Sequence, residues 1–571
     1  MNTASNDADL GLESAKLSDA MHSQGSISCE GLISQRYKLQ RQLKNRHVSM
    51  ISIGGVIGTG LFLGTATGLA NGGPLGLLLS YCVVGSICYS IMISLGEMIA
   101  YLPLPGGHIR LAERFVDPAF SFALGWNYWY NWTIGLPAEL TAAAVLMQFW
   151  RSPDDVNPAV WITMCFVVVL IINVLGVGIY GECEFIFASI KIITIVGLIL
   201  LGVVLDLGGG PSHDRIGFRY WHDPGPFVQF NGISGATGRF LGWWAAMTQA
   251  AFSFIGTEVV AIAGGEAKNP RKNISKAIKR VYIRLLLFYV CGTFIIGLIV
   301  PSTHSDLRLA TSTAARSPFV IAIKTAGIKG LPSVINAAIL TSAWSASSSM
   351  LYSSSRALHS LSVSRTAPRI FSYLTRGGLP IVAIAFNACF GLLAYMAIDA
   401  KAGKVFGWFV NMCAIAGLSN WFGIAVTYLR FYKGLRAQGF ERSNMPYANL
   451  LNPYAAWWAA IACPTICLFS GFSVFLKDSW QTDVFITTYL PFALFPILYT
   501  GARLWWRVKP RRPTEMDFLS GTEEVDEACY DEAPPKNWVE RFWSWLLIIH
   551  ILRLSSRAAP PAASKDADGF T

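Results

Sequence analysis

Charge is scarce in this sequence of 571 residues: Asp, Glu, Lys and Arg make up 14% of it, against about 25% in ordinary soluble domains. So few charges cannot coat the roughly three or four water-soluble domains that the length alone would suggest. Apolar residues make up 53% of the chain, and its mean hydropathy is +0.44. The composition excludes a disordered, collagen-like or disulfide-scaffold chain and favours a polytopic membrane protein.

The sequence also lacks the common catalytic and metal-binding patterns. Its eight His form no HExxH pattern, no GxSxG elbow follows a strand, and no GxxxxGK[ST] phosphate loop is present. The 11 Cys show neither CxxC nor zinc-like Cys/His spacing, so we expect them to pack as small apolar residues. We therefore predict that the protein is not an enzyme and binds no metal or cofactor.

The apolar residues are grouped into runs long enough to cross a bilayer, which takes a helix of about 20 residues. Residues 1–30 contain no apolar run, so we expect no cleavable signal peptide. The fold class that follows is all-α integral membrane, with twelve transmembrane helices. The predicted spans are 49–70, 76–101, 120–149, 159–178, 184–206, 240–264, 280–301, 331–361, 379–398, 404–429, 453–476 and 484–506.

Basic residues predict the orientation. If the amino terminus is cytoplasmic, the inside segments, among them 31–48, 266–280 and 503–512, are strongly basic, while the outside connections are nearly neutral. This asymmetry satisfies the positive-inside rule with both termini cytoplasmic. The formal net charge of +11 is thus a topology signal, and we expect no nucleic-acid partner.

The chain divides into three predicted parts. Residues 1–48 form a cytoplasmic amino-terminal tail, residues 49–506 a twelve-helix membrane domain, and residues 507–571 an acidic cytoplasmic tail. Within that second tail, 538–552 mixes Trp, Phe and Leu with charged residues and is too short to span. We predict an interfacial helix there.

Two spans have unusual compositions. The first contains Gly54-Gly55-Val56-Ile57-Gly58-Thr59-Gly60, where each Gly costs about 1 kcal/mol of helix propensity. The sixth contains Phe252-Ser253-Phe254-Ile255-Gly256-Thr257-Glu258. Close helix packing through small residues is one interpretation. Clusters this dense favour discontinuous helices, as in inverted-repeat transporters, whose helix ends near the midplane bind charged substrate groups.

An amino acid fits a pair of interrupted helices, because freed N–H groups attract its carboxylate and freed carbonyls attract its ammonium. Spans one and six hold equivalent places if spans 1–5 and 6–10 are two repeats. We therefore predict a five-plus-five inverted-repeat core with discontinuous helices 1 and 6, to which helices 11 and 12 are added.

Several blocks, in order along the chain, resemble the fungal amino acid permeases of the amino acid-polyamine-organocation superfamily. They are GGVIGTGLFLG, PLPGGH, FSFIGTE followed by GGEAKNPRKN, and TSAWSASSSMLYSSSRAL followed by APRIF. The resemblance runs from about Leu43 to Asp517. SAWSA, LPAELTAAAVLMQFW, YLRFYKG and EMDF are more narrowly similar to the dicarboxylic branch, which imports glutamate and aspartate.

The resemblance implies a substrate site made largely of backbone. Amides would hold the substrate carboxylate, and carbonyls would hold its ammonium group. The amides are those of Gly58, Thr59 and Gly60, and the carbonyls are those of Val56, Phe252 and Ile255. Phe252 matches an aromatic gate in related transporters, with a plain core aromatic as the alternative. Ser345 and its neighbouring serines on the eighth span are further candidates for substrate contact, or for packing between helices.

Ionisable residues within spans are functional candidates because each costs about 2.5 to 3.5 kcal/mol near a helix centre. Lys191 matches a span-five lysine that takes the place of sodium in proton-coupled relatives; the alternative is a lysine that snorkels to the cytoplasmic face. Glu139 follows a predicted kink and could serve substrate, proton or structure. We expect Glu258 to anchor the break in span six and Glu97 to lie at a helix terminus.

Together these features predict a multi-pass plasma-membrane importer of amino acids that works by proton symport and alternating access. Acidic amino acids are the expected substrates; a broad or neutral permease and a non-transporting sensor are the alternatives. One departure from the dicarboxylic pattern, Ser347-Ser348-Ser349, bears on specificity. The expected partners are the amino acid, protons, the lipid bilayer and ubiquitin-ligase machinery at the tails, with Lys16 or Lys38 as acceptors.

Overall fold

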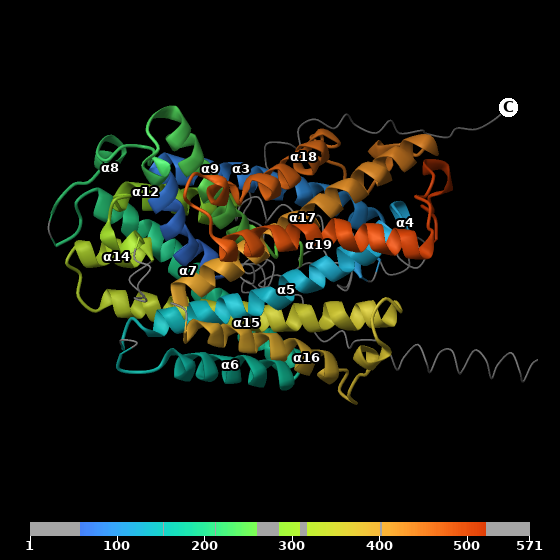
Figure 1. The fold of residues 1–571 in the computed structure, drawn as a ribbon, viewed down its shortest axis with the longest axis horizontal. Helices are drawn as coiled ribbons and strands as arrows, with labels where there is room; N and C mark the ends of the chain where they lie inside the picture. Colours follow the sequence, from blue (N-terminus) through green and yellow to red (C-terminus); the bar gives the residue numbers. More distant parts are fainter. Residues whose placement is uncertain are drawn as a thin grey trace, which may run out of the picture. The chain divides into compact units, whose positions relative to one another are not determined.

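The computed structural model describes residues 57–104, 106–151, 154–211, 213–259, 285–308, 317–399 and 402–520. These residues form helices joined by turns and irregular segments, without a strand among them, as the composition predicts. The longer helices (Figure 1) are α3 (Thr65–Tyr101), α5 (Pro118–Met147), α6 (Pro158–Val174), α7 (Val177–Asp206), α9 (Gly235–Phe254), α15 (Leu331–Val363), α16 (Ile381–Gly391), α17 (Ala402–Ala437), α18 (Tyr454–Phe469) and α19 (Thr482–Trp506).

Short elements extend or connect these helices. The π-helix η2 (Gly60–Gly64) leads into α3, and the π-helix η4 (Leu285–Val290) leads into α12 (Cys291–Ile299). The 3-10 helix η7 (Leu392–Ala397) continues α16. The remaining connectors are α4 (Gly107–Phe115), α8 (Arg219–His222), η3 (Phe230–Gly232), α13 (Ser305–Arg308), α14 (Pro318–Thr325), η6 (Arg369–Ser372), η8 (Arg442–Asn444), η9 (Phe472–Phe475) and η10 (Pro513–Glu515).

Each predicted span overlaps a described helix, and the first two spans meet within α3. Gly73 there has φ 76° and ψ 177°, and it precedes Pro74, which has no N–H to donate. The Leu75 amide instead donates to the Pro226 carbonyl at 3.0 Å, so this break in the helix is satisfied from a neighbouring loop. Two predicted spans therefore correspond to the two sides of one bent helix.

Four helical stretches are long and apolar enough to cross a membrane: Gly60–Tyr101, Val177–Asp206, Ala402–Ala437 and Thr482–Trp506. Shorter apolar helices cover Pro158–Val174, Leu286–Ile299, Ile381–Ala397 and Tyr454–Phe469. The most apolar window of Ala402–Ala437 is 78% buried inside the molecule, against 17% for Thr482–Trp506. The helix α17 is therefore central, whereas α19 presents apolar side chains outward, as a lipid-facing helix does.

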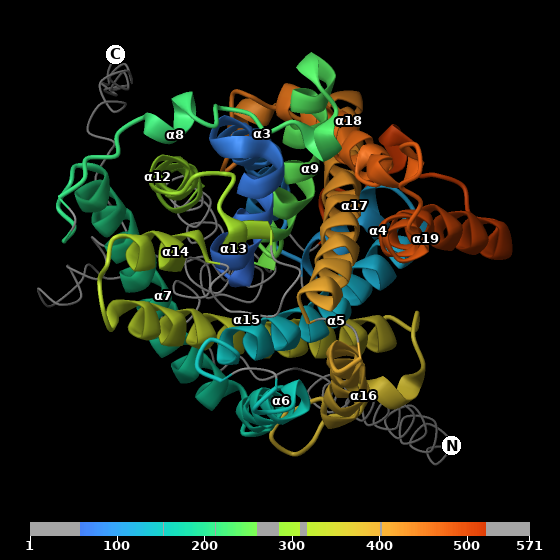
Figure 2. The ribbon, with the colours of Figure 1, turned by 60° about the vertical axis from the view of Figure 1, so that its left-hand side comes forward.

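The central packing brings helices that are distant in sequence side by side. The helix α5 lies along α15 and α17, and α3 lies along α9 (Figures 1 and 2). Small residues permit the close approach: a Cβ on Gly125 of α5 would come within 2.7 Å of Leu361 on α15, and one on Gly417 of α17 within 2.6 Å of Ile255. Such contacts are typical of helix association in membranes.

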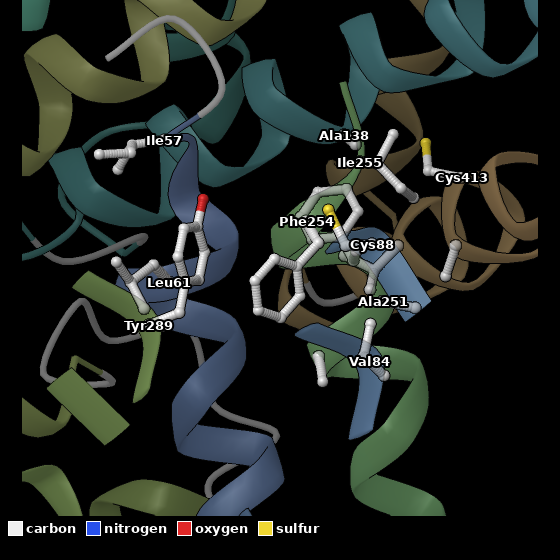
Figure 3. Packing of buried hydrophobic residues seen from close by; sticks show 14 of the residues in the cluster. Ile57, Leu61, Val84, Cys88, Ala138, Ala251, Phe254, Ile255, Tyr289 and Cys413 are labelled. Atoms are coloured by element: carbon white, nitrogen blue, oxygen red, sulfur yellow. The ribbon is translucent and has the colours of Figure 1, made fainter. Parts of the chain in front are cut away.

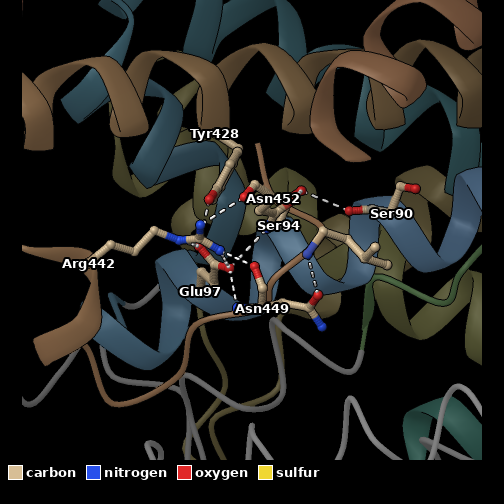
Figure 4. A network of polar contacts seen from close by, with 8 residues as sticks. Ser90, Ser94, Glu97, Tyr428, Arg442, Asn449 and Asn452 are labelled. Atoms are coloured by element: carbon tan, nitrogen blue, oxygen red, sulfur yellow. Dashed lines mark hydrogen bonds and ion pairs between the residues drawn. The ribbon is translucent and has the colours of Figure 1, made fainter. Parts of the chain in front are cut away.

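A buried polar network joins the end of α3 to the connection between α17 and α18 (Figure 4). The Glu97 side chain is 0% exposed. Its carboxylate forms an ion pair with the Arg442 guanidinium, in which Arg442 Nη2 lies 2.7 Å from Glu97 Oε1. Tyr428 donates to Glu97 Oε2 at 2.5 Å, and the Asn449 amide donates to Oε1 at 2.7 Å. Glu97 therefore lies near a helix terminus, as predicted, and ties two distant segments together.

The first part of the predicted carboxyl-terminal tail is packed on the helices. Phe518 is 1% exposed, and its ring lies 5.1 Å from that of Phe115 and 5.6 Å from that of Phe431. Partial burial would raise the pKa of Asp517, but hydrogen bonds from Ser520 and Leu519 and the charge of Arg114 lower it to about 2. The tail segment 1–48 and the predicted interfacial helix 538–552 lie outside the described residues.

Candidate functional site

Both unusual spans are interrupted where the described chain can be followed. In the first, Ile57 and Gly58 are not helical, and the helix begins at Thr59 and runs into η2. In the sixth, α9 ends at Phe254, and the chain turns through Ile255 and Gly256, whose φ is 90°. These two interruptions place a helix start and a helix end beside each other: a Cβ on Gly60 would come within 2.9 Å of the Ser253 Cα.

An aromatic cluster supports the end of α9. The Phe254 ring stacks on that of Tyr289, with centroids 4.3 Å apart; Figure 3 labels both residues. The Phe254 ring also lies 5.6 Å from that of Tyr81. The Tyr81 hydroxyl hydrogen-bonds the Ser253 hydroxyl at 2.7 Å. Buried aromatic side chains of this size contribute much of the packing energy of a core. These contacts with Tyr81 of α3 and Tyr289 of η4 fix the position of the interruption at the end of α9.

The carboxylate of Glu139 lies at the start of the first-span helix. The Thr59 hydroxyl donates to Glu139 Oε2 at 2.9 Å, and the Thr59 amide points at Oε1 from 3.4 Å. The positive end of a helix dipole favours an anion at this position. Ser342 holds the preceding turn by donating to the Ile57 carbonyl at 3.2 Å. A carboxylate of the protein thus sits where the sequence predicts the carboxylate of a substrate.

A small cavity lies between the two interruptions. About 30 Å³ of it is open to the centres of water molecules, which is room for about two waters. An amino acid needs the surrounding side chains to move before it can enter. The lining residues are Gly58, Gly60, Asn131, Trp132, Glu139, Phe252, Ser253, Ile255, Gly256, Ala346, Ser349, Met350 and Cys413.

Asn131 supplies unused hydrogen-bonding groups to this cavity. Its side chain is 2% exposed, and both its Oδ1 and its Nδ2 lack a hydrogen-bond partner within the described part of the chain. Buried amides are almost always paired, so an unpaired one points to a missing partner. Asn131 was not predicted. An amide in an apolar span, about two helical turns before Glu139, was the signal that could have found it.

A second polar group lies behind the cavity, between α7 and α15. Lys191 is 1% exposed, and its Nζ donates to the Ser345 hydroxyl at 2.8 Å. Ser345 in turn donates to Glu184 Oε2 at 2.7 Å. A snorkelling lysine would reach water, whereas this one points into the protein. Ser345 thus joins two buried charged residues, while its neighbours Ala346 and Ser349 line the cavity.

The structure brings most of the predicted site residues together. Gly58, Gly60, Glu139, Phe252 and Ile255 line one cavity, and Thr59 holds Glu139. Glu258 is 0% exposed and accepts from the Trp421 indole at 3.2 Å, so it ties the sixth-span turn to α17. Val56 lies outside the described residues. Glu184 was not singled out, although its spacing of seven residues before Lys191 puts both on one helix face.

No group of three or more His, Cys, Asp and Glu that could hold a metal ion occurs in the described ranges. The polar groups around the cavity are instead a helix start, a carboxylate and an amide. This arrangement suits a small zwitterion that is bound and released unchanged.

The model of the "Amino acid permease" family matches residues 47–514. The chain belongs to the amino acid permease family. It is 41% identical to a proline-specific permease of Emericella nidulans over 526 residues, which cover 90% of this chain and 95% of that one. It is also 41% identical to a dicarboxylic amino acid permease of Saccharomyces cerevisiae over 495 residues, covering 86% and 81%.

A general amino-acid permease of Saccharomyces cerevisiae is 40% identical to the permease over 500 residues, covering 87% of this chain and 82% of the relative. The permease is therefore a multi-pass membrane transporter of amino acids and not an enzyme. The family predicted from the sequence blocks is confirmed. The relatives carry names with different substrates at nearly equal identity, so identity alone does not select the dicarboxylic branch.

Proposed function

We propose that the permease imports amino acids across the plasma membrane by proton symport and alternating access, from the cavity between its two interrupted helices. The observation that carries the proposal is the meeting of the first-span helix start, the end of α9 and Glu139 around one cavity. The twelve spans, the five-plus-five repeat and the cytoplasmic termini are parts of the same proposal.

Substrate binding follows from the backbone at the two interruptions. The amides of Gly58, Thr59 and Gly60 hold the substrate carboxylate. The carbonyls of Phe252 and Ile255, with that of Val56, hold the ammonium group. The ring of Phe252 packs edge-on against Phe406, with centroids 6.1 Å apart, and covers the cavity as a gate. The side-chain amide of Asn131, which has no hydrogen-bond partner among the described residues, supplies a further polar contact.

Glu139 couples the substrate to a proton in this proposal. The substrate carboxylate and the Glu139 carboxylate compete for one helix start. Two ionised carboxylates repel strongly at such short range, and protonation of one removes the repulsion. Binding of the amino acid therefore requires Glu139 to move away or to take up a proton. Lys191, buried behind the cavity, is the second coupling residue.

Neutral amino acids are the substrates that the cavity favours. None of its described lining residues is Lys or Arg, so nothing in that lining pairs with a side-chain carboxylate. The relative named for proline covers the largest share of both chains among those compared above. Acidic amino acids are the second candidate, favoured by the equal identity to the dicarboxylic permease and by the SAWSA and EMDF blocks, which resemble the dicarboxylic branch.

Uptake by a transport-deficient host tests this function. Cells that express the permease should accumulate radiolabelled proline, and a protonophore should abolish the accumulation. Competition by each of the common amino acids then ranks the substrates: competition by glutamate and aspartate alone would favour the dicarboxylic alternative. A well-expressed protein that moves no amino acid would overturn the proposal and support the sensor alternative. The predicted ubiquitin acceptors Lys16 and Lys38 lie outside the described residues.

A further inference from the structure

Glu184 is a buried carboxylate that the proposed binding site does not use. It lies on α7 two turns before Lys191 and is 1% exposed. An ionisable residue inside a membrane helix carries a cost of about 2.5 to 3.5 kcal/mol. Membrane helices therefore keep such residues mainly where they act on ions, protons or substrates.

A single hydroxyl connects Glu184 to the coupling lysine. Lys191 Nζ donates to Ser345 Oγ at 2.8 Å, and Ser345 donates its own proton to Glu184 Oε2 at 2.7 Å. Each donor therefore points toward Glu184. A hydroxyl that accepts from one group and donates to the next can pass a proton along the pair.

We propose that Glu184 receives the coupling proton from Lys191 through Ser345, and that this relay delivers it to the cytoplasmic side. Lys191 gives one N–H proton to Ser345 Oγ while the Ser345 hydroxyl proton passes to Glu184. The step converts an ammonium and a carboxylate into a neutral amine and a carboxylic acid, and Ser345 is unchanged. The relay rests on the proton symport proposed above.

The other carboxylate oxygen of Glu184, Oε1, is open to take part in proton transfer. Oε1 makes no hydrogen bond of good geometry within the described ranges, although the Ser349 hydroxyl lies nearby. A carboxylate that only stabilised the fold would be expected to use both oxygens. A flip of the carboxyl group exchanges the places of its two oxygens, so the proton received from Ser345 can then pass onward from the side where Oε1 lies.

The groups around Glu184 suggest the direction of release. Tyr180, one turn nearer the start of α7, hydrogen-bonds Ser349 at 3.1 Å and stacks on Tyr352 at 4.1 Å. The guanidinium of Arg356 lies 3.2 Å from the centre of the Tyr352 ring. The positive-inside prediction puts this end of α7 and Arg356 on the cytoplasmic side. The stacked rings lie between the relay and that side.

Few titratable groups compete with this transfer. Among the described residues, the titratable groups that interact with Glu184 directly are Lys191, Tyr180 and Cys183, all on α7. From the packed elements, α5 contributes Glu139, which faces Lys191, and α15 contributes Arg356, which faces Tyr180. Tyrosine and cysteine are neutral near pH 7 in their ordinary state. Within the described part of the chain, Glu184 and Glu139 are therefore the two carboxylates whose charges act on Lys191.

The test uses the full-length permease in proteoliposomes with an imposed pH gradient. Two readouts are compared: amino acid accumulation driven by the gradient, and exchange of labelled for unlabelled amino acid, which needs no net proton movement. The variant Glu184→Gln keeps the size of the side chain but cannot take a proton. Glu182→Gln, the same change on a partly exposed residue of the same helix, is the control.

For Glu184→Gln, we expect driven accumulation to fall at least about tenfold, with loss of its pH dependence, while exchange stays near the wild-type rate. Glu182→Gln should behave like the wild type. Accumulation by Glu184→Gln with a wild-type pH profile would overturn the relay. If the wild type itself accumulates nothing in response to the gradient, proton symport fails first, and the relay fails with it.

Ser345 provides a second test if Glu184→Gln does not fold. Ser345→Thr retains the bridging hydroxyl, whereas Ser345→Ala removes it and leaves both charged residues in place. We expect driven accumulation for the threonine variant and its loss for the alanine variant. Equal accumulation by the two variants would contradict a relay through this hydroxyl.

Discussion

At the residue scale, the site depends on the absence of a side chain at Gly58. A Cβ at this position would lie 2.6 Å from Glu139 Oε1, well inside contact distance. Glycine therefore lets the Glu139 carboxylate approach the helix start and the Thr59 hydroxyl. The same closeness places Glu139 where it competes with a substrate carboxylate. One missing methyl group thus connects the helix interruption to the proposed coupling.

We expect Gly58→Ala to displace Glu139 and to lower the rate of uptake by at least about tenfold, because misplacement of a site group by about 1 Å can cost a factor of this order or more. Initial rates of uptake, corrected for the amount of protein at the cell surface, measure the effect. Gly197→Ala in α7 is the matched control, since a Cβ there meets nothing within 4 Å. Equal uptake by both variants would show that Glu139 need not lie so close.

At the element scale, buried polar contacts hold particular helices together, as apolar packing does. The Glu97 network joins the end of α3 to the segment between α17 and α18, although these segments are far apart in sequence. Glu97 is fully buried, so its charge depends on Arg442 and on the donors around it. Loss of one member of a buried ion pair costs about 3 to 5 kcal/mol, because the other charge remains buried.

Arg442→Ala should therefore destabilise the permease by about 3 kcal/mol, seen as a lower apparent melting temperature of the detergent-solubilised protein. Arg436→Ala is the control, since Arg436 is an exposed residue near the end of α17. An equal melting temperature for the two variants would mean that solvent replaces Arg442 at Glu97. Glu97→Gln should recover part of the loss when combined with Arg442→Ala, because it removes the unpaired charge.

At the scale of the whole molecule, proposed transport requires the two faces of the membrane to be distinct. The positive-inside pattern puts both termini and the basic connections in the cytoplasm, and it puts 206–239 and 302–330 outside. The described helices include four stretches that are both long and apolar enough to span, of which Gly60–Tyr101 is bent at Gly73. A count of twelve crossings is compatible with that bend and remains a prediction.

Labelling of single cysteines from outside intact cells tests this topology. A cysteine at Asp214 or Phe218, both in the predicted outside segment 206–239, should react with a membrane-impermeant maleimide. A cysteine at Arg436 should react only after the membrane is opened. Labelling of the Arg436 cysteine in intact cells, together with the cysteine at Asp214 or Phe218, would contradict the predicted orientation. A version with its exposed native cysteines replaced provides the background.

The sequence by itself determined the class of the protein and the place of its interruptions, because both depend on local properties. Runs of about 20 apolar residues have few alternatives to membrane helices. Clusters of glycine in such a run favour an interruption of the helix, because glycine has a low helix propensity. A carboxylate in such a run indicates a functional position, because its burial in the membrane is costly. Glu139 could therefore be selected without a structure, while Gly58, Thr59 and Phe252 are the site residues that the resemblance to the permeases implies.

The tertiary structure decided which of these residues meet, because contacts between α5, α7, α15 and the two interruptions depend on packing. It placed Glu139 on Thr59, turned the Lys191 side chain inward, and gave Ser345 a place between Lys191 and Glu184. The predicted span 184–206 starts at Glu184, so hydropathy puts this carboxylate at the end of a span, whereas α7 begins at Val177 and already buries it. Burial is a property of the packed bundle, and it is burial that turns an ordinary charge into a functional candidate.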